Sequence, residues 1–398
     1  MDTWKKQFAI IYAGQAFSLI GSAAVQFAII WWLTIQTESA VTLTIAAIVS
    51  FIPNMVIGPF AGIWIDRYNR RTIMMAADGL VALSSVFLAA AFLFMDTVPI
   101  WFVYGILFLR GLGASFHLPA MQAAIPMLVP PEMLVKAGGW GNLINSVSSM
   151  IGPVIGAAMM GAMHIASIML VDIFGAALAI ISLLFVRIPD VPQNEQKPDA
   201  LKDMKQGFAA IRSNKPLVTV LPTLLLCNVI SMPLGTLFPL LVRTHFGGEA
   251  LHNSMCELLF AGGLLVSSIV MGVWGGMKKR FLMVSMAIGL FGIISAIGGL
   301  LPPSGFWWFV ICCFFMGGCG TFINVPFMAY IQETTAPEMM GKVLSLLMSG
   351  ITLAMPLGLL VAGPVSEFIG IDKWFAYSGV LMMLTGVLCW IRTRRIES

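Results

Sequence analysis

The stretch GPFAGIWIDRYNRR, residues 58–71, changes character abruptly after Ile65. Eight apolar or small residues are followed, within six positions, by four charged ones: Asp66, Arg67, Arg70 and Arg71. A soluble amphipathic helix mixes polar and apolar residues every three or four positions. An uncharged block that ends in such a cluster indicates instead the boundary of a membrane, where arginines hold the loop on one side.

The composition of the whole chain supports a membrane protein. Of 398 residues, 59% are apolar and only 10% are charged, and the mean hydropathy is +0.93. Soluble domains carry about 25% charged residues, so that class is excluded. Apolar windows of about 20 residues, which is long enough to cross ~30 Å of hydrocarbon, recur from end to end. The sequence therefore predicts an all-α polytopic membrane protein.

The apolar windows predict twelve membrane spans, at residues 8–34, 42–65, 73–94, 100–121, 140–160, 164–187, 215–243, 254–277, 281–301, 305–331, 344–369 and 374–391. With the N-terminus in the cytoplasm, 19 of the 22 Lys and Arg residues fall on the cytoplasmic side. That asymmetry follows the positive-inside rule. We therefore expect a multi-pass protein of the bacterial cell membrane with both termini in the cytoplasm.

One long polar stretch, residues 187–215, interrupts the apolar windows. Its prolines indicate a loop, and the segment DALKDMKQGFAAIRSN within it predicts a short amphipathic helix on the membrane surface. The stretch divides the chain into an N-terminal six-helix bundle at 1–187, a cytoplasmic linker at 188–214 and a C-terminal six-helix bundle at 215–398.

The two halves repeat one another. GLGASFHLPAMQAAIPMLVPPEMLVK, residues 111–136, aligns with GGCGTFINVPFMAYIQETTAPEMMGK, residues 317–342, at a constant offset of 206, so that Gly111 matches Gly317. Two six-helix halves in the same orientation are the parallel-repeat design of major facilitator transporters, whose substrate site lies between the repeats. We therefore expect two pseudo-symmetric bundles.

The segment GIWIDRYNRR resembles the signature of the loop between the second and third helices in the major facilitator superfamily, G-x-x-x-D-R-x-G-R-R/K. Asn69 stands where the family usually has glycine, and we expect it to share the tolerance of glycine for positive φ. The weaker counterpart at 272–280 has Gly276 in place of the acid.

The resemblance and the charges predict a latch at a cytoplasmic gate, in which charged side chains pair when the gate closes. Asp78, one turn into the next span, is expected to pair with Arg70 or Arg71 as part of it. The alternative is that the arginines only hold the loop in the cytoplasm. The predicted latch residues are Gly62, Asp66, Arg67, Arg70, Arg71 and Asp78.

Three ionisable residues inside the spans are candidates for proton coupling. Such a side chain costs at least ~2.5–3.5 kcal/mol in hydrocarbon, which makes it a functional candidate by default. Arg110 lies ten residues into its span, about 15 Å deep at 1.5 Å per residue. It resembles the arginine of a second family motif, associated with proton coupling in exporters, although the usual glutamine is missing. Asp172 and Glu257 are candidates to carry the proton. Structural roles are the alternatives for Arg110 and Asp172: a pin between helices and a packing residue.

A further motif favours export over import. GPVIGA, residues 152–157, resembles the G-P-x-x-G-G pattern of proton-antiporting exporters, with Gly152, Pro153 and Gly156 present and Ala157 in place of the last glycine. Proline kinks a helix, and small residues give it a flat face. We expect this face to pack closely across the two halves.

The few charges, 28 methionines and 27 phenylalanines favour a pliable apolar cavity for bulky lipophilic cargo. In the fold that the resemblance implies, the first, fourth, seventh and tenth spans line it. His117 has the alternative of filling space as a hydrogen-bonded core residue. The candidate cavity residues are Gln26, Trp31, His117, Asn228, Met232, Phe322 and Asn324.

The chain has no G-x-x-x-x-G-K-[ST] loop and no HExxH or Cys/His ligand set. We therefore expect no enzyme, no cofactor and no metal, and an ion gradient as the energy source. The partners we expect are a lipophilic small molecule, protons and membrane lipid, with no nucleic acid, acting on a monomer.

Four stretches are similar to the first, fourth, seventh and tenth spans of the bacterial macrolide efflux branch of the superfamily: WKKQFAIIYAGQAFSLIGSAAVQFAIIWWL, RGLGASFHLPAMQAAIPMLVPPE, LFPLLVRTHFGG and LPPSGFWWFVICCFFMGG. This resemblance implies proton-driven export of macrolide antibiotics by a secondary transporter. The alternatives are export of a siderophore, a lipid or another drug, coupling to Na⁺, an uncoupled facilitator, and a non-transporting membrane receptor on the same fold.

Overall fold

The computed structural model describes residues 3–186 and 200–394. Within these ranges, the side chains left undescribed are those at 3, 59–60, 62–63, 66–67, 135, 200–203 and 337–338. The described chain is helical and contains no strand. Twelve of its helices are long and apolar enough to cross a membrane, which confirms the predicted all-α polytopic fold.

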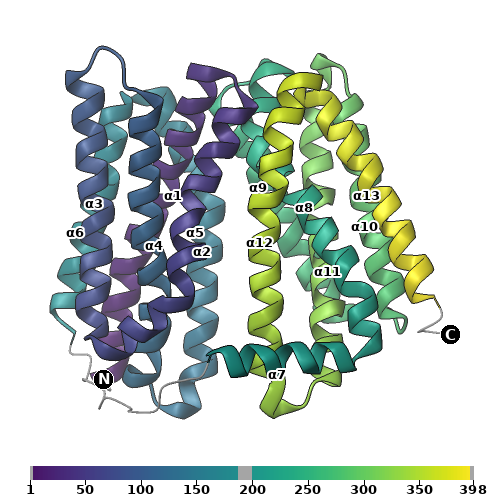
Figure 1. Cartoon of the computed structure of the whole chain (residues 1–398). Helices are drawn as coiled ribbons and strands as arrows, with labels where there is room; N and C mark the ends of the chain where they lie inside the picture. The colour runs from purple at the N-terminus through teal and green to yellow at the C-terminus, as the bar shows by residue number, and fades with distance from the viewer. Residues whose placement is uncertain (1–2, 187–199, 395–398) are drawn as a thin grey trace. The chain divides into compact units, whose positions relative to one another are not determined.

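The structure divides into two compact units, and the first comprises Met1–Gln36 and Ile45–Glu195. Its helices, in Figure 1, run from purple to blue, and α3 packs against both α4 and α6. They are α1 (Thr3–Thr37), α2 (Ala40–Arg67), α3 (Arg70–Phe94), α4 (Ile100–Leu128), the short η1 (Pro131–Met133), α5 (Leu134–Ala162) and α6 (Ile165–Leu184).

The second unit comprises Thr37–Thr44 and Gln196–Ser398. Within it α10 packs along α13, α9 along α11, and α8 against α12 and α13. Its helices are α7 (Ala200–Ser213), α8 (Lys215–Thr244), α9 (Ala250–Trp274), α10 (Arg280–Leu300), the short η2 (Pro303–Gly305), α11 (Phe306–Thr334), α12 (Pro337–Ile369) and α13 (Ile371–Thr393). Residues 188–199 of the predicted linker lie outside the described residues, and its remainder forms α7.

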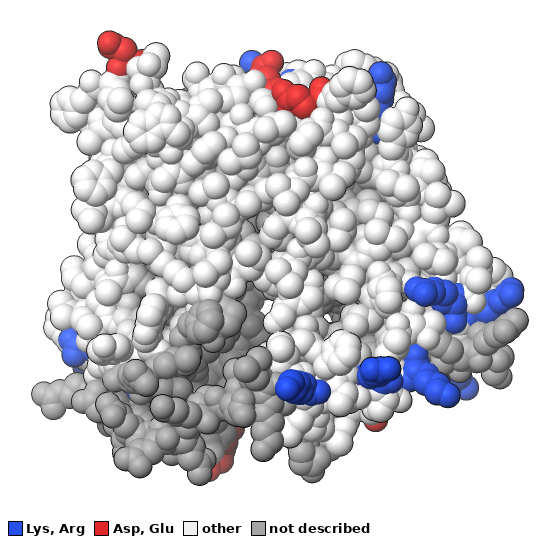
Figure 2. Space-filling model, in the orientation of Figure 1, with Lys and Arg blue, Asp and Glu red and all other residues white. Residues whose placement is uncertain are grey.

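Charged side chains gather near the ends of the helices on the face shown in Figure 2, and a broad uncharged zone lies between them. Large apolar side chains are exposed on the helices of both units, among them Phe174 of α6 and Val273 of α9, at 66% and 87% exposure. Such surfaces are stable against lipid and unfavourable in water. The surface therefore agrees with twelve helices that cross a membrane.

Glycines bring helices together at equivalent places in the two units. In the first unit, a Cβ at Gly111 of α4 would overlap the Ser50 carbonyl of α2. In the second, a Cβ at Gly317 of α11 would overlap the Phe260 carbonyl of α9. Because apolar side chains gain little by leaving lipid, close backbone approach through small residues is what drives such crossings. Gly111 and Gly317, which the internal repeat aligns, therefore each allow a close crossing of two helices.

The loop after α2 ends in a helix cap. Asn69 has φ −63° and ψ 121°, and its side chain accepts a hydrogen bond from the Arg71 backbone N–H at 2.9 Å. Asn69 therefore does not use the positive φ that asparagine tolerates. Asparagine serves here as an N-cap, which satisfies one of the free N–H groups at the start of α3.

Helix α7 confirms that the polar stretch forms a short amphipathic helix. Gly207 and Ile211 are buried, and Gly207 lies against the Lys342 backbone of α12. Met204 and Phe208 are exposed at 52% and 60%, although the helical spacing places them on the same face as Gly207 and Ile211. The helix thus has one apolar face, of which one edge packs on α12 and the other stays exposed.

Candidate transport site

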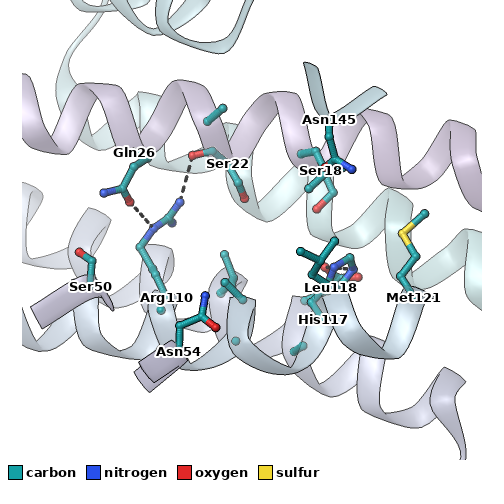
Figure 3. A pocket seen from close by; sticks show the side chains of 18 of the residues that line it. Ser18, Ser22, Gln26, Ser50, Asn54, Arg110, His117, Leu118, Met121 and Asn145 are labelled. Carbon is teal, nitrogen blue, oxygen red and sulfur yellow. Dashed lines mark hydrogen bonds and ion pairs between the residues drawn. The ribbon is translucent and has the colours of Figure 1, made fainter. Parts of the chain in front are cut away.

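A cavity of about 470 Å³ opens within the first unit, between α1, α2, α3, α4 and α5. Its lining is mainly apolar, with polar side chains interspersed (Figure 3). The polar lining residues are Ser18, Ser22, Gln26, Ser50, Asn54, Asp78, Arg110, His117 and Asn145. Cavities of this size with a few convergent polar groups are typical of small-molecule sites.

Arg110 of α4 is 7% exposed and forms an ion pair with Asp172 of α6, which is 1% exposed. Asp172 also accepts hydrogen bonds from the hydroxyls of Ser22 and Ser85, the latter at 2.7 Å. Arg110 donates further to the Ser22 carbonyl at 3.2 Å, the Ser85 hydroxyl at 3.0 Å and the Gln26 side chain at 3.4 Å. Figure 3 shows the arginine reaching from α4 to α1. Both buried charges are therefore compensated.

Asp78 of α3 lies in a second polar group of the same cavity. Its Oδ2 accepts a hydrogen bond from the Gln15 amide at 3.3 Å, and its Oδ1 lies 3.5 Å from Nε2 of His117. Asp78 and His117 are both largely buried, with 8% and 12% of their side chains exposed. Two acid–base pairs thus lie at the cavity: Asp78 and His117 both line it, whereas only Arg110 of the other pair does.

The latch residues are only partly described. The side chains of Gly62, Asp66 and Arg67 lie outside the described residues. Arg70 is buried, and Arg71 donates to the Leu184 carbonyl at the end of α6 at 3.1 Å. Asp78 was expected to pair with one of these arginines, and the structure gives it Gln15 and His117 as partners instead. The latch itself stays a prediction.

The antiporter motif lies on α5 and faces α1 of the same unit. A Cβ at Gly152 would overlap Ala23, and one at Gly156 would overlap the Ala24 carbonyl. Pro153 lies inside the helix between them. The expectation that this face packs across the two halves is therefore corrected: its close contacts are with α1, where Ala23 also lines the cavity.

Of the other cavity candidates, Gln26 and His117 line the cavity, and Trp31 does not: it is buried on α1 and stacked on Phe27 at 6.5 Å between ring centroids. Four more lie in the second unit, apart from this cavity: Asn228, Met232, Phe322 and Asn324. The two asparagines donate to carbonyls one turn back in their own helices, at 2.9 and 3.0 Å.

Glu257, the third candidate for proton coupling, also lies in the second unit. It accepts a hydrogen bond from Asn253, one turn earlier in α9, at 2.8 Å. The structure therefore brings Arg110 and Asp172 together as an ion pair within the first unit, whereas Glu257 belongs to the second unit.

Sequence reasoning missed most of the polar lining of the cavity. Gln15, Ser18, Ser22 and Gln26 follow one another on α1 at steps of three and four residues. That spacing is one face of a helix, so a polar stripe in an otherwise apolar span was readable from the sequence. Ser50 and Asn54 of α2 are also one turn apart, and Asn145 of α5 follows Asn142 by three residues, so these shorter polar stripes were readable in the same way.

Comparison with known proteins agrees with this architecture. The model of the Major Facilitator Superfamily matches residues 11–293 and 234–398. Macrolide efflux protein A of Streptococcus pyogenes is 38% identical over 390 residues, which cover 98% of this chain and 96% of the relative. Its namesake from Enterococcus faecalis is 36% identical over 81% of this chain and 99% of the relative.

A solved structure shares the fold. The bacterial homologue of the human lysosomal transporter Spinster, in an inward-facing and unoccupied conformation, superposes with a TM-score of 0.73. The match is 13% identical and covers 99% of this chain and 98% of that one. The helical arrangement is therefore that of a solved transporter of this fold.

Proposed function

We propose, from the premise that this chain belongs to the major facilitator superfamily and to its macrolide efflux branch, that it exports macrolide-type antibiotics in exchange for protons. Its twelve apolar helices make it a multi-pass membrane protein. Transport would proceed by alternating access, with the termini in the cytoplasm and the latch of α2 and α3 at the inner gate. The distribution of Lys and Arg supports this orientation.

The observation that carries the proposal is the cavity of the first unit. Its walls are mainly apolar, which suits a bulky lipophilic molecule, and its hydroxyl and amide groups can bind the oxygens of a macrolide. Three buried ionisable residues also line it: Arg110, which pairs with Asp172 behind the lining, and Asp78 with His117. Charges that are retained at such depth are functional candidates in membrane proteins.

A proton gradient is a sufficient energy source for such export. One elementary charge moving through 100 mV supplies about 2.3 kcal/mol. By the relation between free energy and concentration ratio, this sustains about a 50-fold difference in substrate across the membrane. Exclusion of an antibiotic to that extent protects its target in the cytoplasm.

The test is the accumulation of radiolabelled erythromycin in pump-deficient bacteria that express the chain, with and without a protonophore. We expect low accumulation that rises on uncoupling, and an Arg110→Ala variant that accumulates erythromycin because it leaves Asp172 buried without its cation. An Asp96→Asn variant is the matched control, because Asp96 is exposed in the loop between α3 and α4.

Accumulation equal to that of the empty vector, with verified membrane expression, would exclude macrolides as the cargo. The same cells loaded with a labelled siderophore, a lipid analogue or another lipophilic drug then test the alternative cargoes. Equilibration without uphill movement would identify an uncoupled facilitator, and a Na⁺ ionophore that abolishes export where the protonophore does not would identify Na⁺ as the coupling ion.

A further inference from the structure

We propose that Asp78 and His117 together bind the transported proton, and that Arg110 and Asp172 form a fixed structural pin beside them. This inference rests on the proposed function, since a proton site has a role only in a coupled transporter. It assigns the coupling role to a pair that the family resemblance does not mark, and it removes that role from the arginine motif.

Asp172 is poorly placed to exchange a proton. Its carboxylate accepts from three donors, the Arg110 guanidinium and the hydroxyls of Ser22 and Ser85. A proton on this carboxyl would turn one acceptor into a donor that faces other donors. Asp172 is also 1% exposed and is absent from the lining of the cavity. A fully hydrogen-bonded pair of this kind joins α4 and α6 and leaves no place for an incoming proton.

Asp78 is in the opposite situation. It lines the cavity, and its contacts are long: 3.3 Å from the Gln15 amide and 3.5 Å from the His117 ring. Hydrogen bonds between nitrogen and oxygen centre on 2.9–3.0 Å, so the contact to His117 is a near approach and not a completed bond. The Nε2 of His117 has no hydrogen-bond partner among the described residues although it is buried.

Unpaired buried polar atoms are costly, so the gap between Asp78 and His117 requires an explanation. An added proton strengthens the contact. A neutral ring can donate from Nε2 to the carboxylate, but a second proton on the ring makes this contact a charge-assisted bond between ions, which is shorter and stronger. Gln15 can adjust with it, because its Oε1 also has no partner among the described residues. The cluster is thus loosely hydrogen-bonded without the added proton and can close when the proton binds.

The charges that face this pair favour exchange. Asp172 lies outside the lining of the cavity, and Arg110 compensates its charge. The polar side chains that α1, α2 and α5 contribute to the lining are uncharged: Ser18, Ser22, Gln26, Ser50, Asn54 and Asn145. Gln15, which donates to Asp78, is uncharged as well. Asp78 and His117 together therefore carry one negative charge without the transported proton and no net charge with it. A change of one charge in a largely apolar cavity is large enough to bias the two states of a transporter.

Proton release on substrate binding tests the proposal directly. The purified full chain in detergent, in weak buffer with a pH-sensitive dye, receives erythromycin while the proton concentration is recorded. We expect the wild-type protein to release protons when it binds, and Asp78→Asn and His117→Gln to release none at erythromycin concentrations that saturate each variant's own binding, whatever its affinity. In proteoliposomes, at saturating erythromycin, both variants should lose uphill transport.

Two further variants separate a proton site from a structural defect. Asp96→Asn, an acid-to-amide change at an exposed loop residue, should release protons as the wild type does. Asp172→Asn should lower the melting temperature, because it leaves Arg110 buried without its counter-ion, but the protein that remains folded should still release protons. Asp78→Asn and His117→Gln should keep the melting temperature and the elution volume of the wild type.

The proposal is overturned if Asp78→Asn still releases protons, or if Asp172→Asn stays stable and alone abolishes the release. It is also overturned, with the export function intact, if the wild-type protein binds and exports erythromycin but releases no proton. A wild-type protein that neither binds nor exports erythromycin contradicts the proposed function first, and this inference with it.

Discussion

Helices α4 and α11 occupy the same register in the two units, because an offset of 206 residues aligns them. Both place a glycine at a close helix crossing, Gly111 in the first unit and Gly317 in the second. At the residue before that glycine, however, α4 has Arg110 and α11 has Met316, which is fully buried. The repeat thus retains its packing residues and differs in its charges.

The same contrast recurs two turns further on. The register of His117 in α4 is taken by Ile323 in α11. Near this part of α11 the second unit has a hydroxyl cluster in place of ion pairs, with Ser267 donating to Thr321 at 2.7 Å. Hydroxyl groups bind each other without a net charge, so they need no counter-ion in the membrane. We infer that the first unit performs the ion chemistry and that the second unit shares its scaffold.

The largest effect is expected when Arg110 of α4 is replaced by methionine, the residue at the equivalent position of α11. Arg110→Met leaves Asp172 charged, buried and without its cation, so we expect a loss of about 3–5 kcal/mol in the free energy of unfolding, together with the loss of uphill export. Thermal unfolding in detergent and erythromycin accumulation measure the two effects.

The matched control is Met316→Leu, which exchanges buried apolar side chains of similar volume in the second unit. It should cost less than about 1.5 kcal/mol and retain export. Equal losses for the two variants would contradict the assignment of the buried charge chemistry to the first unit.

A smaller and symmetric effect is expected at the shared glycines. Gly111→Ala and Gly317→Ala each insert a methyl group against a carbonyl of the neighbouring helix, so each should cost about 1–3 kcal/mol by overpacking. Gly105→Ala and Gly262→Ala are the controls in α4 and α9, since nothing lies within 4 Å of a Cβ at either position. Melting temperatures compare the four; tolerance at one shared glycine alone would show that the two crossings are not equivalent.

A still smaller effect on stability is expected from substitutions in the loops after α2 and α9. Asn69 caps α3 with its side chain, whereas Lys279, at the start of α10, makes no side-chain cap. Asn69→Ala should therefore cost about 1 kcal/mol, and Lys279→Ala should change the melting temperature little. Similar melting temperatures for the two variants would show that the side-chain cap does not explain why this loop has asparagine in place of glycine.

The fold was predictable from the sequence for a specific reason. Lipid forces every backbone polar group to be satisfied within a helix, so apolar windows of sufficient length can only be spans. The repeat at an offset of 206 then follows from residues such as Gly111 and Gly317, whose packing role limits substitution.

The partners of the buried charges were not predictable in the same way. Arg110 and Asp172 lie 62 residues apart in sequence, and their meeting depends on the rotation of α4 and α6 about their own axes. Asp78 was assigned to the arginine loop because that loop is close in sequence, while its partners come from α1 and α4. Sequence proximity identifies neighbours along a helix, whereas the side chain of a span reaches neighbours across the bundle.

The smallest effect is expected at Glu257, the residue of the second unit that the sequence analysis proposed as a carrier of the proton. Glu257 is hydrogen-bonded to Asn253 within its own helix, apart from the pairs of the first unit, so Glu257→Gln should cost no more than about 1 kcal/mol. Export that stays uphill and sensitive to a protonophore would leave coupling with the first unit, where Asp78→Asn abolishes it. If Glu257→Gln instead lost uphill transport but kept exchange, the proton would be carried in the second unit, and the contrast between α4 and α11 would describe stability alone.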